Sequence, residues 1–290
     1  MRLGITMFAT DQTMPPHTLA IAAEERGFSS LYLPEHTHIP TSRRTPSAAT
    51  LETSGVGASG FLRGDSGDET LSESYARTLD PFVSLAMAAS VTSTLTLGTG
   101  VALLAQREPI VTAKAVASLQ HLSGGRVVLG VGYGWNVEEA EDHGVVWGER
   151  RALVAERLRV MRALWRDEVA AYKGEFEVLS PSWAWPKADV PVLFGGGGGP
   201  KLFAAIAELG DGWMPIGGAG VAEALPKLSA AFEAAGRDPA TASVIPFGTL
   251  PTPGKLEHFA ALGVTETVLR VTSGTRDAVL RELDAHARFL

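Results

Sequence analysis

Short runs of β-branched and apolar residues alternate along the chain with longer, alanine-rich runs of helical periodicity. This alternation is typical of repeated βα units, in which each strand is followed by a helix that covers a parallel sheet. The pattern predicts eight such units. The predicted strands are 3–8, 30–34, 95–103, 126–131, 190–194, 212–215, 243–249 and 267–271. The predicted helices of the first half are 15–26, 81–91, 110–122 and 147–166, and those of the second half end at residues 209, 235, 262 and 289.

Eight βα units within 290 residues predict an α/β fold of the (β/α)8 TIM-barrel type, forming a single domain over residues 1–290. The alternative is an open, doubly wound sheet of the Rossmann or flavodoxin type. Glycine-rich segments follow several strands, at 98–100, 130–134 and 195–199, and this favours the barrel. Active sites of such barrels lie at the carboxyl ends of the strands, so the residues that follow each strand are the candidates.

Two connections are too long to be ordinary turns. Residues 37–79 are rich in Ser, Thr, Gly and Asp, show little periodicity, and follow the second strand on the expected active face. Connections of this length are usually functional or disordered, so we predict an inserted substrate lid, with an insertion of no functional consequence as the alternative. The second connection, 171–189, carries Trp183 and Trp185 between prolines and is interpreted as a packing or subunit contact.

Composition and charge narrow the class of partner. Apolar residues make up 45% of the chain, and 32 acidic residues against 25 basic ones give a net charge of −7. No block of like charges occurs, which argues against a nucleic acid or an anionic membrane surface as partner. The absence of cysteine excludes disulfides, iron–sulfur clusters and thiol catalysis. Since the N-terminus shows no signal-peptide pattern, we predict a cytoplasmic protein, with a small molecule as its partner.

A histidine and a carboxylate follow the second predicted strand, within the sequence Pro-Glu-His-Thr-His at 34–38. A histidine at a barrel strand end can donate or accept a proton near neutral pH. We therefore predict that His36 is catalytic, with a hydrogen-bonded structural histidine as the alternative. Glu35, His36 and His38 are also possible metal ligands by residue type, but no further cluster completes such a site, and we predict no metal.

Glycine alternates with small or aromatic residues at the ends of the third and fourth strands. Leu-Gly-Thr-Gly-Val at 97–101 is typical of a bulge or of close backbone approach to a flat ligand. Gly-Val-Gly-Tyr-Gly-Trp-Asn at 130–136 lacks the third glycine of a dinucleotide fingerprint. Asn136 and Glu139 match a capping box, which accounts for both residues as the start of a helix.

Five consecutive glycines, 195–199, stand between Phe194 and Pro200 and lead into an alanine-rich helix. A glycine-rich turn that presents free amides at a helix N-terminus favours an anion. This run predicts a phosphate site, with a flexible linker as the alternative. No lysine lies in a predicted strand and no Gly-x-Ser-x-Gly elbow occurs, which argues against Schiff-base and serine-hydrolase chemistry. The remaining features suit a phosphorylated redox cofactor.

Several of these segments together resemble the bacterial luciferase-like flavin and deazaflavin superfamily, over roughly residues 1–215. Within it the chain is most similar to the branch that uses coenzyme F420, an 8-hydroxy-5-deazaflavin. The resemblance is carried by Ala-Ala-Glu-Glu-Arg-Gly-Phe-Ser-Ser-Leu-Tyr-Leu-Pro-Glu-His at 22–36, Asp-Pro-Phe at 80–82, 97–101, Gln-Arg-Glu-Pro at 106–109, Leu-Ser-Gly-Gly-Arg at 122–126, 130–135, 195–199 and Gly-Asp-Gly-Trp at 210–213.

The resemblance implies a cofactor ring over the carboxyl ends of the strands, backed by a non-prolyl cis peptide at Gly100–Val101. It implies that His36 lies next to the ring and that Tyr133 or Trp135 lines the substrate side. Sugar-phosphate dehydrogenase relatives carry a glutamate where Tyr133 stands, so we do not expect their substrate. The catalytic candidates are His36 and Tyr133, and the cofactor-binding candidates are Thr99, Gly100, Val101, Gly132, Gly134, Trp135, Asn136, Gly196, Gly197 and Gly198.

The function predicted on this basis is hydride transfer between coenzyme F420 and a modest, mostly apolar organic substrate. The closest alternative is an FMN-dependent monooxygenase that uses oxygen. Two further classes are a flavin- or deazaflavin-binding protein without turnover and a phosphate-site barrel isomerase without a redox cofactor. We also expect a homodimer.

Overall fold

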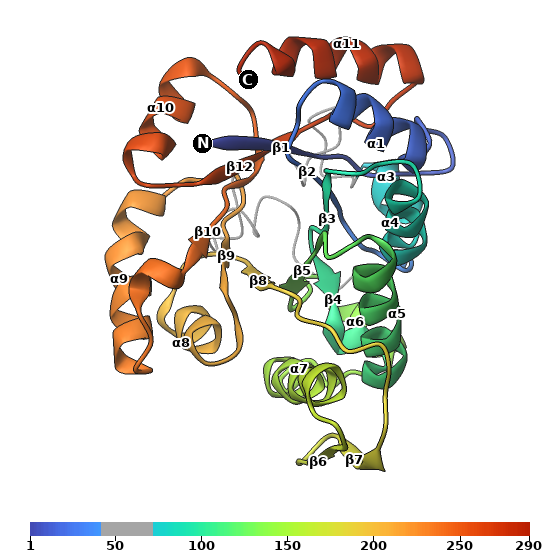
Figure 1. The fold of residues 1–290 in the computed structure, drawn as a ribbon, viewed down its shortest axis with the longest axis vertical. Coiled ribbons are helices and arrows are strands. Elements are labelled where there is room, and N and C mark those ends of the chain that lie inside the picture. Colours follow the sequence, from blue (N-terminus) through green and yellow to red (C-terminus); the bar gives the residue numbers. More distant parts are fainter. Residues whose placement is uncertain (42–71) are drawn as a thin grey trace.

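The computed structural model describes residues 1–41 and 72–290, and Figure 1 shows its strands around a common centre with helices outside. Most of the predicted lid falls within 42–71, outside the described residues, so the lid stays a prediction. The strands are β1 (Arg2–Thr6), β2 (Ser30–Leu33), β3 (Thr96–Thr99), β4 (Ala102–Leu103), β5 (Val127–Gly132), β6 (Ala170–Lys173), β7 (Val178–Ser182), β8 (Val192–Gly195), β9 (Gly212–Met214), β10 (Ser243–Val244), β11 (Phe247–Thr249) and β12 (Glu266–Arg270). The helices are α1 (Pro16–Glu25), α3 (Glu73–Ala76), α4 (Pro81–Ala89), α5 (Pro109–Leu122), α6 (Val137–Asp142), α7 (Arg150–Arg166), α8 (Pro200–Leu209), α9 (Val221–Ala234), α10 (Pro253–Ala261) and α11 (Arg276–Ala287), with 3-10 turns at Leu104–Gln106 and Pro239–Thr241.

The main sheet is parallel and curled, with the strand order β10-β9-β8-β5-β3-β2-β1-β12-β11. The first and last strands of this order, β10 and β11, are two pieces of one short stretch of chain. Hydrogen bonds from that stretch reach both of its neighbours: Ile245 N donates to Trp213 O at 2.9 Å, and Val268 N donates to Pro246 O at 2.9 Å. The predicted α/β fold with a parallel sheet is confirmed, and the sheet is curled.

Each predicted strand overlaps an observed one, but two are interrupted. The predicted strand 95–103 divides into β3 and β4 at Gly100–Val101, whose peptide bond is cis, as the resemblance implied. The predicted strand 243–249 divides at Ile245–Pro246, and Pro246 has no N–H to donate to a neighbouring strand. The long predicted helix 147–166 is shorter than expected and begins at Arg150, because the turn before it includes Gly148.

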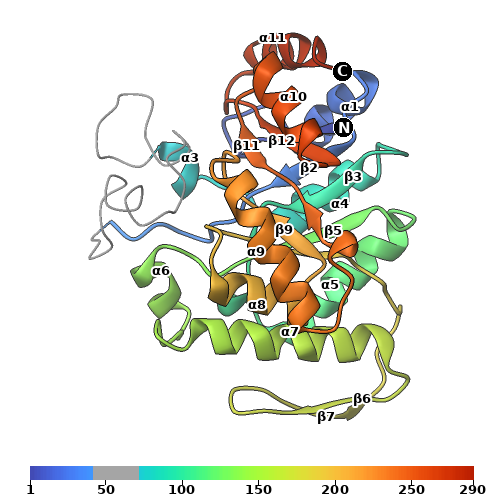
Figure 2. The same cartoon turned by 90° about the vertical axis from the view of Figure 1, so that its left-hand side faces the viewer.

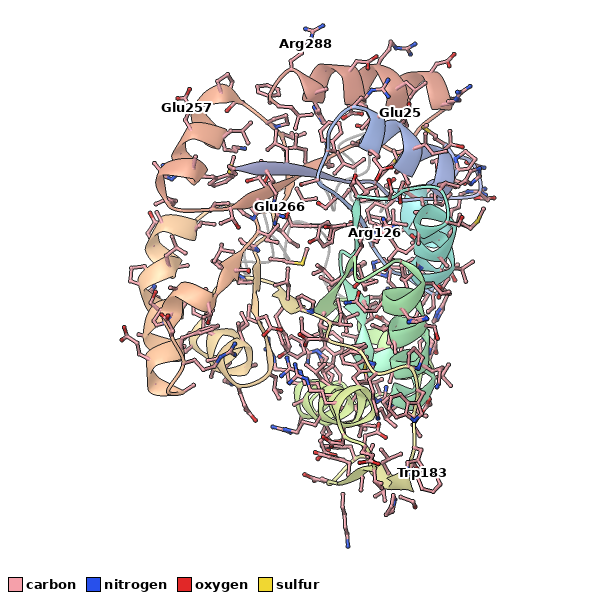
Figure 3. The ribbon with its side chains drawn as sticks, viewed as in Figure 1. Glu25, Arg126, Trp183, Glu257, Glu266 and Arg288 are labelled. Carbon is pink, nitrogen blue, oxygen red and sulfur yellow. The ribbon has the colours of Figure 1, made fainter. Side chains whose placement is uncertain are left out.

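The sequence patterns missed a hairpin, in which β6 and β7 pair antiparallel outside the main sheet. Helix α6, which follows β5, begins at the predicted capping box. Figure 2 shows this hairpin beyond α7, at the end of the molecule far from α11. Trp183 follows the hairpin and is 78% exposed (Figure 3). Its exposure means that Trp183 does not pack into the core of this chain, so of the two interpretations of this segment the packing one is wrong for Trp183.

The loop that leads into β3 is held by one carboxylate and one guanidinium. Glu24 Oε1 accepts from the backbone N–H groups of Ser93 at 2.9 Å, Thr94 at 2.6 Å and Leu95 at 3.0 Å, and from the Thr94 hydroxyl. Arg126, labelled in Figure 3, donates to carbonyl oxygens on the same loop, including Leu95 O at 2.7 Å. Burial acts to raise the pKa of Glu24, but these hydrogen bonds outweigh it and lower the pKa to about 2.

Some of the helices begin at favourable capping sequences. Asp80 accepts from Val83 N before α4, and Thr252 accepts from Lys255 N before α10, each followed by a proline in the first turn. Each such cap satisfies an amide that has no partner inside the helix. Within residues 1–41 and 72–290, no helix is both long enough and apolar enough to cross a bilayer.

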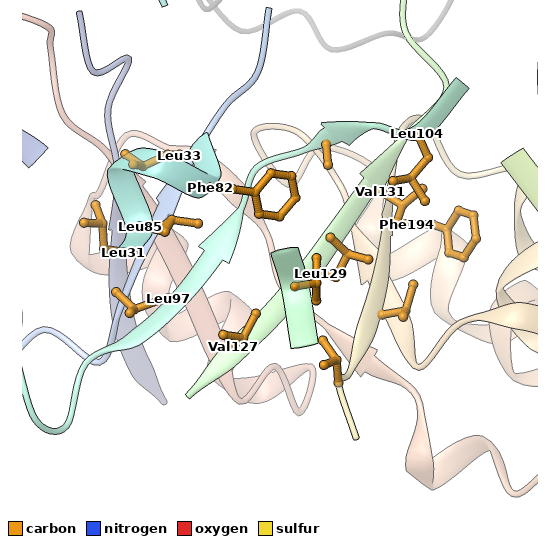
Figure 4. Packing of buried hydrophobic residues seen from close by; sticks show 14 of the residues in the cluster. Leu31, Leu33, Phe82, Leu85, Leu97, Leu104, Val127, Leu129, Val131 and Phe194 are labelled. Carbon is orange, nitrogen blue, oxygen red and sulfur yellow. The ribbon is translucent and has the colours of Figure 1, made fainter. Parts of the chain in front are cut away.

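The larger part of the core lies between the sheet and the surrounding helices. Figure 4 shows Leu31, Leu97 and Leu129 on three strands of the sheet, with Phe82 and Leu85 of α4 packed beside them. Burying an aliphatic or aromatic side chain of this size contributes about 1.5–3 kcal/mol. A smaller apolar cluster fills the inside of the curled sheet, and its buried members are Tyr32, Leu193, Met214, Ile245, Phe247 and Val268. The helices and the inner cluster hold the strand ends in a fixed arrangement around the cavity described next.

Candidate functional site

A cavity of about 320 Å³ opens at the carboxyl ends of the strands. Segments next to most strands of the main sheet contribute to its wall, together with α3, α7 and α8. This is expected for an active site of a parallel α/β sheet. Most lining residues are aromatic, aliphatic or glycine. They are Phe8, Pro34, Glu35, His36, Tyr75, Gly100, Val101, Leu103, Gly132, Tyr133, Gly134, Trp135, Trp147, Arg150, Arg151, Gly195, Gly196, Gly197, Leu202, Met214, Ile216 and Phe247.

His36 is buried at the wall of this cavity, and both of its ring nitrogens have partners. Nδ1 lies 2.9 Å from Glu139 Oε2, and the indole Nε1 of Trp135 donates to His36 Nε2 at 3.3 Å. An indole nitrogen can only donate, so Nε2 accepts and Nδ1 carries the proton that it donates to Glu139. His36 is therefore neutral here, with the lone pair of Nε2 directed towards Trp135.

Glu139 fixes this tautomer and is itself held firmly. Its carboxylate is buried on α6, with Oε2 on His36 and Oε1 accepting from Thr37 N at 3.2 Å. The predicted cap is confirmed, since Asn136 Oδ1 accepts from Glu139 N at 3.3 Å. The Glu139 carboxylate, however, binds His36 and Thr37, which follow β2, whereas its own helix follows β5. Sequence reasoning missed this role because the capping box already accounted for Glu139.

Glu35, the neighbour of His36, has a structural role on the other side of the strand end. Glu35 Oε2 accepts from Leu103 N at 2.7 Å, and Oε1 accepts from Arg107 Nε at 2.6 Å. Arg107 Nη2 also donates to Asp80 at 2.6 Å. Burial opposes the charge of Arg107, but these carboxylates prevail and raise its pKa. Within the described residues no group of three or more His, Asp or Glu side chains is arranged to hold a metal.

The two ends of the 37–79 segment are anchored beside the cavity. At the first end, the Thr37 hydroxyl lies 2.7 Å from His143 Nε2, in addition to its backbone contact with Glu139. At the other end, Leu79 N donates to Ala9 O at 2.9 Å, and Asp80 binds Arg107. These contacts join both ends of the segment to the strand ends that carry His36.

Tyr75 of α3 adds an aromatic ring over His36. Its ring centroid lies 5.2 Å from that of His36, 6.0 Å from Trp135 and 4.6 Å from Phe8. Burial raises the pKa of the Tyr75 hydroxyl, so it is neutral across the physiological range. Sequence reasoning missed this residue because it lies in the stretch without periodicity.

Val101 forms part of the cavity floor, and two glycines make room for it. A Cβ atom on Gly132 would lie 2.3 Å from Val101 Cγ2, and one on Gly195 would lie 2.8 Å from Val101 Cγ1. These distances are shorter than real carbon contacts, so glycine is required at both positions for this packing. The glycine alternation at the strand ends thus has a steric cause.

The glycine run before α8 divides between cavity and core. Gly196 and Gly197 line the cavity, whereas a Cβ atom on Gly198 would meet Phe203 at 2.9 Å and Trp213 at 3.0 Å. Gly199 caps α8 without any side-chain hydrogen bond, which leaves the first amides of the helix open to a ligand. The geometry fits an anion at Gly196 and Gly197.

Of the remaining predicted residues, some line the cavity and others lie outside its lining. Gly134 lines the cavity with a positive φ of 75°, and Tyr133 lines it between Phe194 and Arg151. Burial raises the pKa of Tyr133. Thr99 and Asn136 are outside the lining: the Thr99 hydroxyl donates to Gly130 O at 2.7 Å, and Asn136 caps α6. The structure thus brings His36, Tyr133, Trp135 and most of the predicted glycines to one cavity.

Two mycobacterial proteins resemble this chain, one over almost its whole length and one over about half of it. The uncharacterized protein Rv0953c of Mycobacterium tuberculosis is 42% identical over 282 residues, which cover 96% of this chain and 94% of that protein. The “Putative coenzyme F420-dependent oxidoreductase Rv3520c” of the same organism is 32% identical over 167 residues, which cover 52% of this chain and 48% of that protein.

Among solved structures, an F420-dependent secondary alcohol dehydrogenase in complex with an F420-acetone adduct superposes with a TM-score of 0.72 at 19% identity, covering 100% of this chain and 98% of that one. This likeness shows a shared fold. The family model described as “Luciferase-like monooxygenase” matches residues 16–251. The chain therefore belongs to the luciferase-like monooxygenase family, whose members are oxidoreductases and monooxygenases.

Proposed function

We propose that this protein transfers a hydride between coenzyme F420 and a small organic substrate that carries a hydroxyl or carbonyl group. The observation that carries the proposal is His36, whose Nε2 lone pair lies at the cavity wall while Glu139 holds Nδ1. The similarity to a relative named as F420-dependent supports the choice of cofactor. The curled sheet is interpreted as a (β/α)8 barrel, in keeping with the strand order.

The cavity suits a flat ring with a phosphate-bearing tail. Val101, Gly132 and Gly134 would lie along the ring, since glycine leaves a flat wall without side chains. Gly196 and Gly197, with the open amides at the start of α8, would hold the phosphate. When bound, F420 supplies the carbon that accepts or gives up hydride, which no protein side chain can do.

His36 then transfers the proton that accompanies the hydride. In the oxidation of an alcohol, Nε2 accepts the hydroxyl proton as the carbon loses its hydride, and Glu139 stabilises the imidazolium that forms. In the reduction of a carbonyl, the same imidazolium returns the proton to the oxygen. Before substrate binds, the Trp135 indole N–H donates to Nε2, and the substrate hydroxyl would replace this hydrogen bond.

The second candidate is an FMN-dependent monooxygenase, which the family description itself favours. The same glycine turn and flat wall would accommodate FMN. Such an enzyme must protect an oxygen adduct from water, whereas hydride transfer from a deazaflavin requires no oxygen chemistry. Turnover of oxygen with reduced FMN is the observation that would favour this candidate.

Titration with both cofactors, followed by a turnover screen over alcohols and ketones, tests the proposal. We expect micromolar or tighter binding of F420, weak binding of FMN, and F420-dependent turnover of some members of the panel. His36→Ala should lower turnover by roughly 100-fold with the fold intact, on the usual scale of acid–base contributions. His258→Ala, an exposed histidine on α10, serves as control. Tight FMN binding with oxygen uptake, and no response to F420, would establish the monooxygenase instead.

A further inference from the structure

Two adjacent arginines at the start of α7, Arg150 and Arg151, line the cavity. Neither lies within ion-pair distance of any carboxylate in residues 1–41 and 72–290. Arg107 and Arg157, in contrast, do have such partners: Arg107 pairs with Glu35, and Arg157 pairs with Glu177 at 2.8 Å. The wall of an otherwise apolar cavity therefore carries two positive charges that the described protein does not neutralise.

Both guanidinium groups are held in place by aromatic rings. The Arg150 guanidinium lies 3.6 Å from the ring centre of Trp147, and that of Arg151 lies 4.3 Å from the ring centre of Tyr133. Stacking of this kind fixes the plane of a guanidinium and leaves its N–H edge free to bind. Arg150 Nη1 donates to Trp147 O at 2.6 Å, while its Nε is buried and finds no hydrogen-bond partner among residues 1–41 and 72–290.

The unpartnered Nε is the feature that points to a missing ligand. A buried N–H of a charged group that lacks an acceptor is costly, and native proteins rarely leave one so. Burial, with the neighbouring charge of Arg151, also lowers the pKa of Arg150. An anion beside both guanidinium groups would relieve each of these costs.

The arginines and the glycine turn line the same cavity. Arg151 is connected to the turn through aromatic contacts, because it stacks on Tyr133, whose ring centroid lies 6.0 Å from that of Phe194, and the glycine run begins directly after Phe194. A cavity that offers both positive charge and open amides suits a ligand with more than one negative oxygen.

We propose that Arg150 and Arg151 form an oxyanion subsite that binds a phosphate group. Two forked guanidinium groups match the paired oxygens of phosphate better than a single carboxylate does. The inference deepens the proposed function and rests on it in one respect: the phosphate belongs to the cofactor tail or to a substrate bound beside it. The glycine turn alone, the anion site indicated by the sequence, would then be only part of the phosphate-binding wall.

The test compares ligands that differ by a phosphate. Affinities are measured for F420 and its phosphate-free deazaflavin chromophore, for FMN and riboflavin, and for inorganic phosphate alone. The variants are R150Q/R151Q, which removes both charges, and R150K/R151K, which keeps the charges but removes the forks. R281Q, an exposed arginine on α11, is the matched control.

In R150Q/R151Q we expect at least a roughly tenfold loss of affinity for the phosphate-bearing ligands, the scale of hydrogen bonds to charged groups, with the phosphate-free ligands unchanged. R150K/R151K should fall between. If the phosphate belongs to the cofactor, the preference for F420 over its chromophore shrinks. If it belongs to the substrate, that preference persists, and binding of inorganic phosphate to the F420-loaded protein is lost.

Unchanged phosphate affinity and an unchanged preference for F420 in a folded R150Q/R151Q protein would overturn the proposal. Should the double variant fail to fold, R151Q decides the question, because Arg151 is exposed and its replacement leaves the core intact. The phosphate measurement needs neither cofactor nor turnover. If neither F420 nor FMN binds, the proposed function fails, whereas loss of phosphate binding in R151Q still supports the subsite.

Discussion

Replacing Glu139 with glutamine should disable His36 with almost no change in shape. The amide can satisfy only one of the two groups that the carboxylate serves. If its oxygen stays on Thr37 N, its NH2 faces His36 Nδ1, which must then accept, and the ring proton moves to Nε2, facing the Trp135 N–H. If the amide is reversed, the NH2 faces the Thr37 N–H. Either orientation places two donors against each other.

The size of the effect follows from these contacts. One unsatisfied buried donor costs about 1–3 kcal/mol, so the free energy of unfolding should fall by about that amount. Turnover should fall by about 10- to 100-fold, because the imidazolium loses its carboxylate and Nε2 loses its lone pair. The Michaelis constant should change little, since Glu139 is not among the residues that line the cavity.

The assay combines steady-state kinetics with ¹⁵N NMR of the His36 ring, which reports which nitrogen carries the proton. Wild type should show the proton on Nδ1, and Glu139→Gln should show it on Nε2 or a mixture. Asp142→Asn is the matched control, since Asp142 lies on the same helix and binds a surface histidine, His38, at 3.0 Å. Wild-type turnover together with an unchanged ring proton in Glu139→Gln would refute the reasoning.

Three further predictions concern two glycines that line the cavity and the carboxylate that holds the loop before β3. Gly132→Ala should destabilise the fold by about 1–3 kcal/mol in urea unfolding, because its Cβ would overlap Val101, and adding Val101→Ala should restore part of the loss; additive effects would contradict this. Gly197→Val should weaken cofactor binding in titrations far more than it lowers Tm, and equal affinity would return the glycines to the linker interpretation. The pKa of Glu24 is lowered, so its contribution to stability is complete above about pH 4.5 and is lost as pH falls towards about 2. The difference in unfolding free energy between wild type and Glu24→Gln, measured by urea unfolding, should therefore shrink over that range, and a constant difference would contradict this.

The strand ends could be predicted from the sequence because their signal is local. His36 follows a short apolar run, and the glycines at 130–134 and 195–199 follow two others, so a parallel sheet must bring all three to one edge. The pairing of His36 with Glu139 joins residues 103 positions apart. A local sequence pattern cannot predict a contact between residues so far apart in the chain. The capping box had also already explained Glu139 locally.

Arg150 and Arg151 were overlooked for a related reason. Charged residues in the first turn of a helix usually face solvent, and their sequence neighbours give no sign of the cavity. The role proposed for them depends partly on Tyr133, which reaches the cavity from another segment of the chain, as well as on Trp147 in the turn before α7. Tyr75 was missed for another reason, since it lies within the 37–79 stretch, whose composition predicts no helix or strand.

The contacts at the two ends of the 37–79 segment tie it to the rest of the molecule independently of its middle. Thr37 is fixed by Glu139 and His143 at one end, and Asp80 is fixed by Arg107 at the other. Among the described residues, the side chains that contact His36 include Glu139, Trp135 and Tyr75. We therefore expect that exchanging sequence between Thr37 and α3, with Tyr75 and both anchors kept, leaves the position of His36 unchanged.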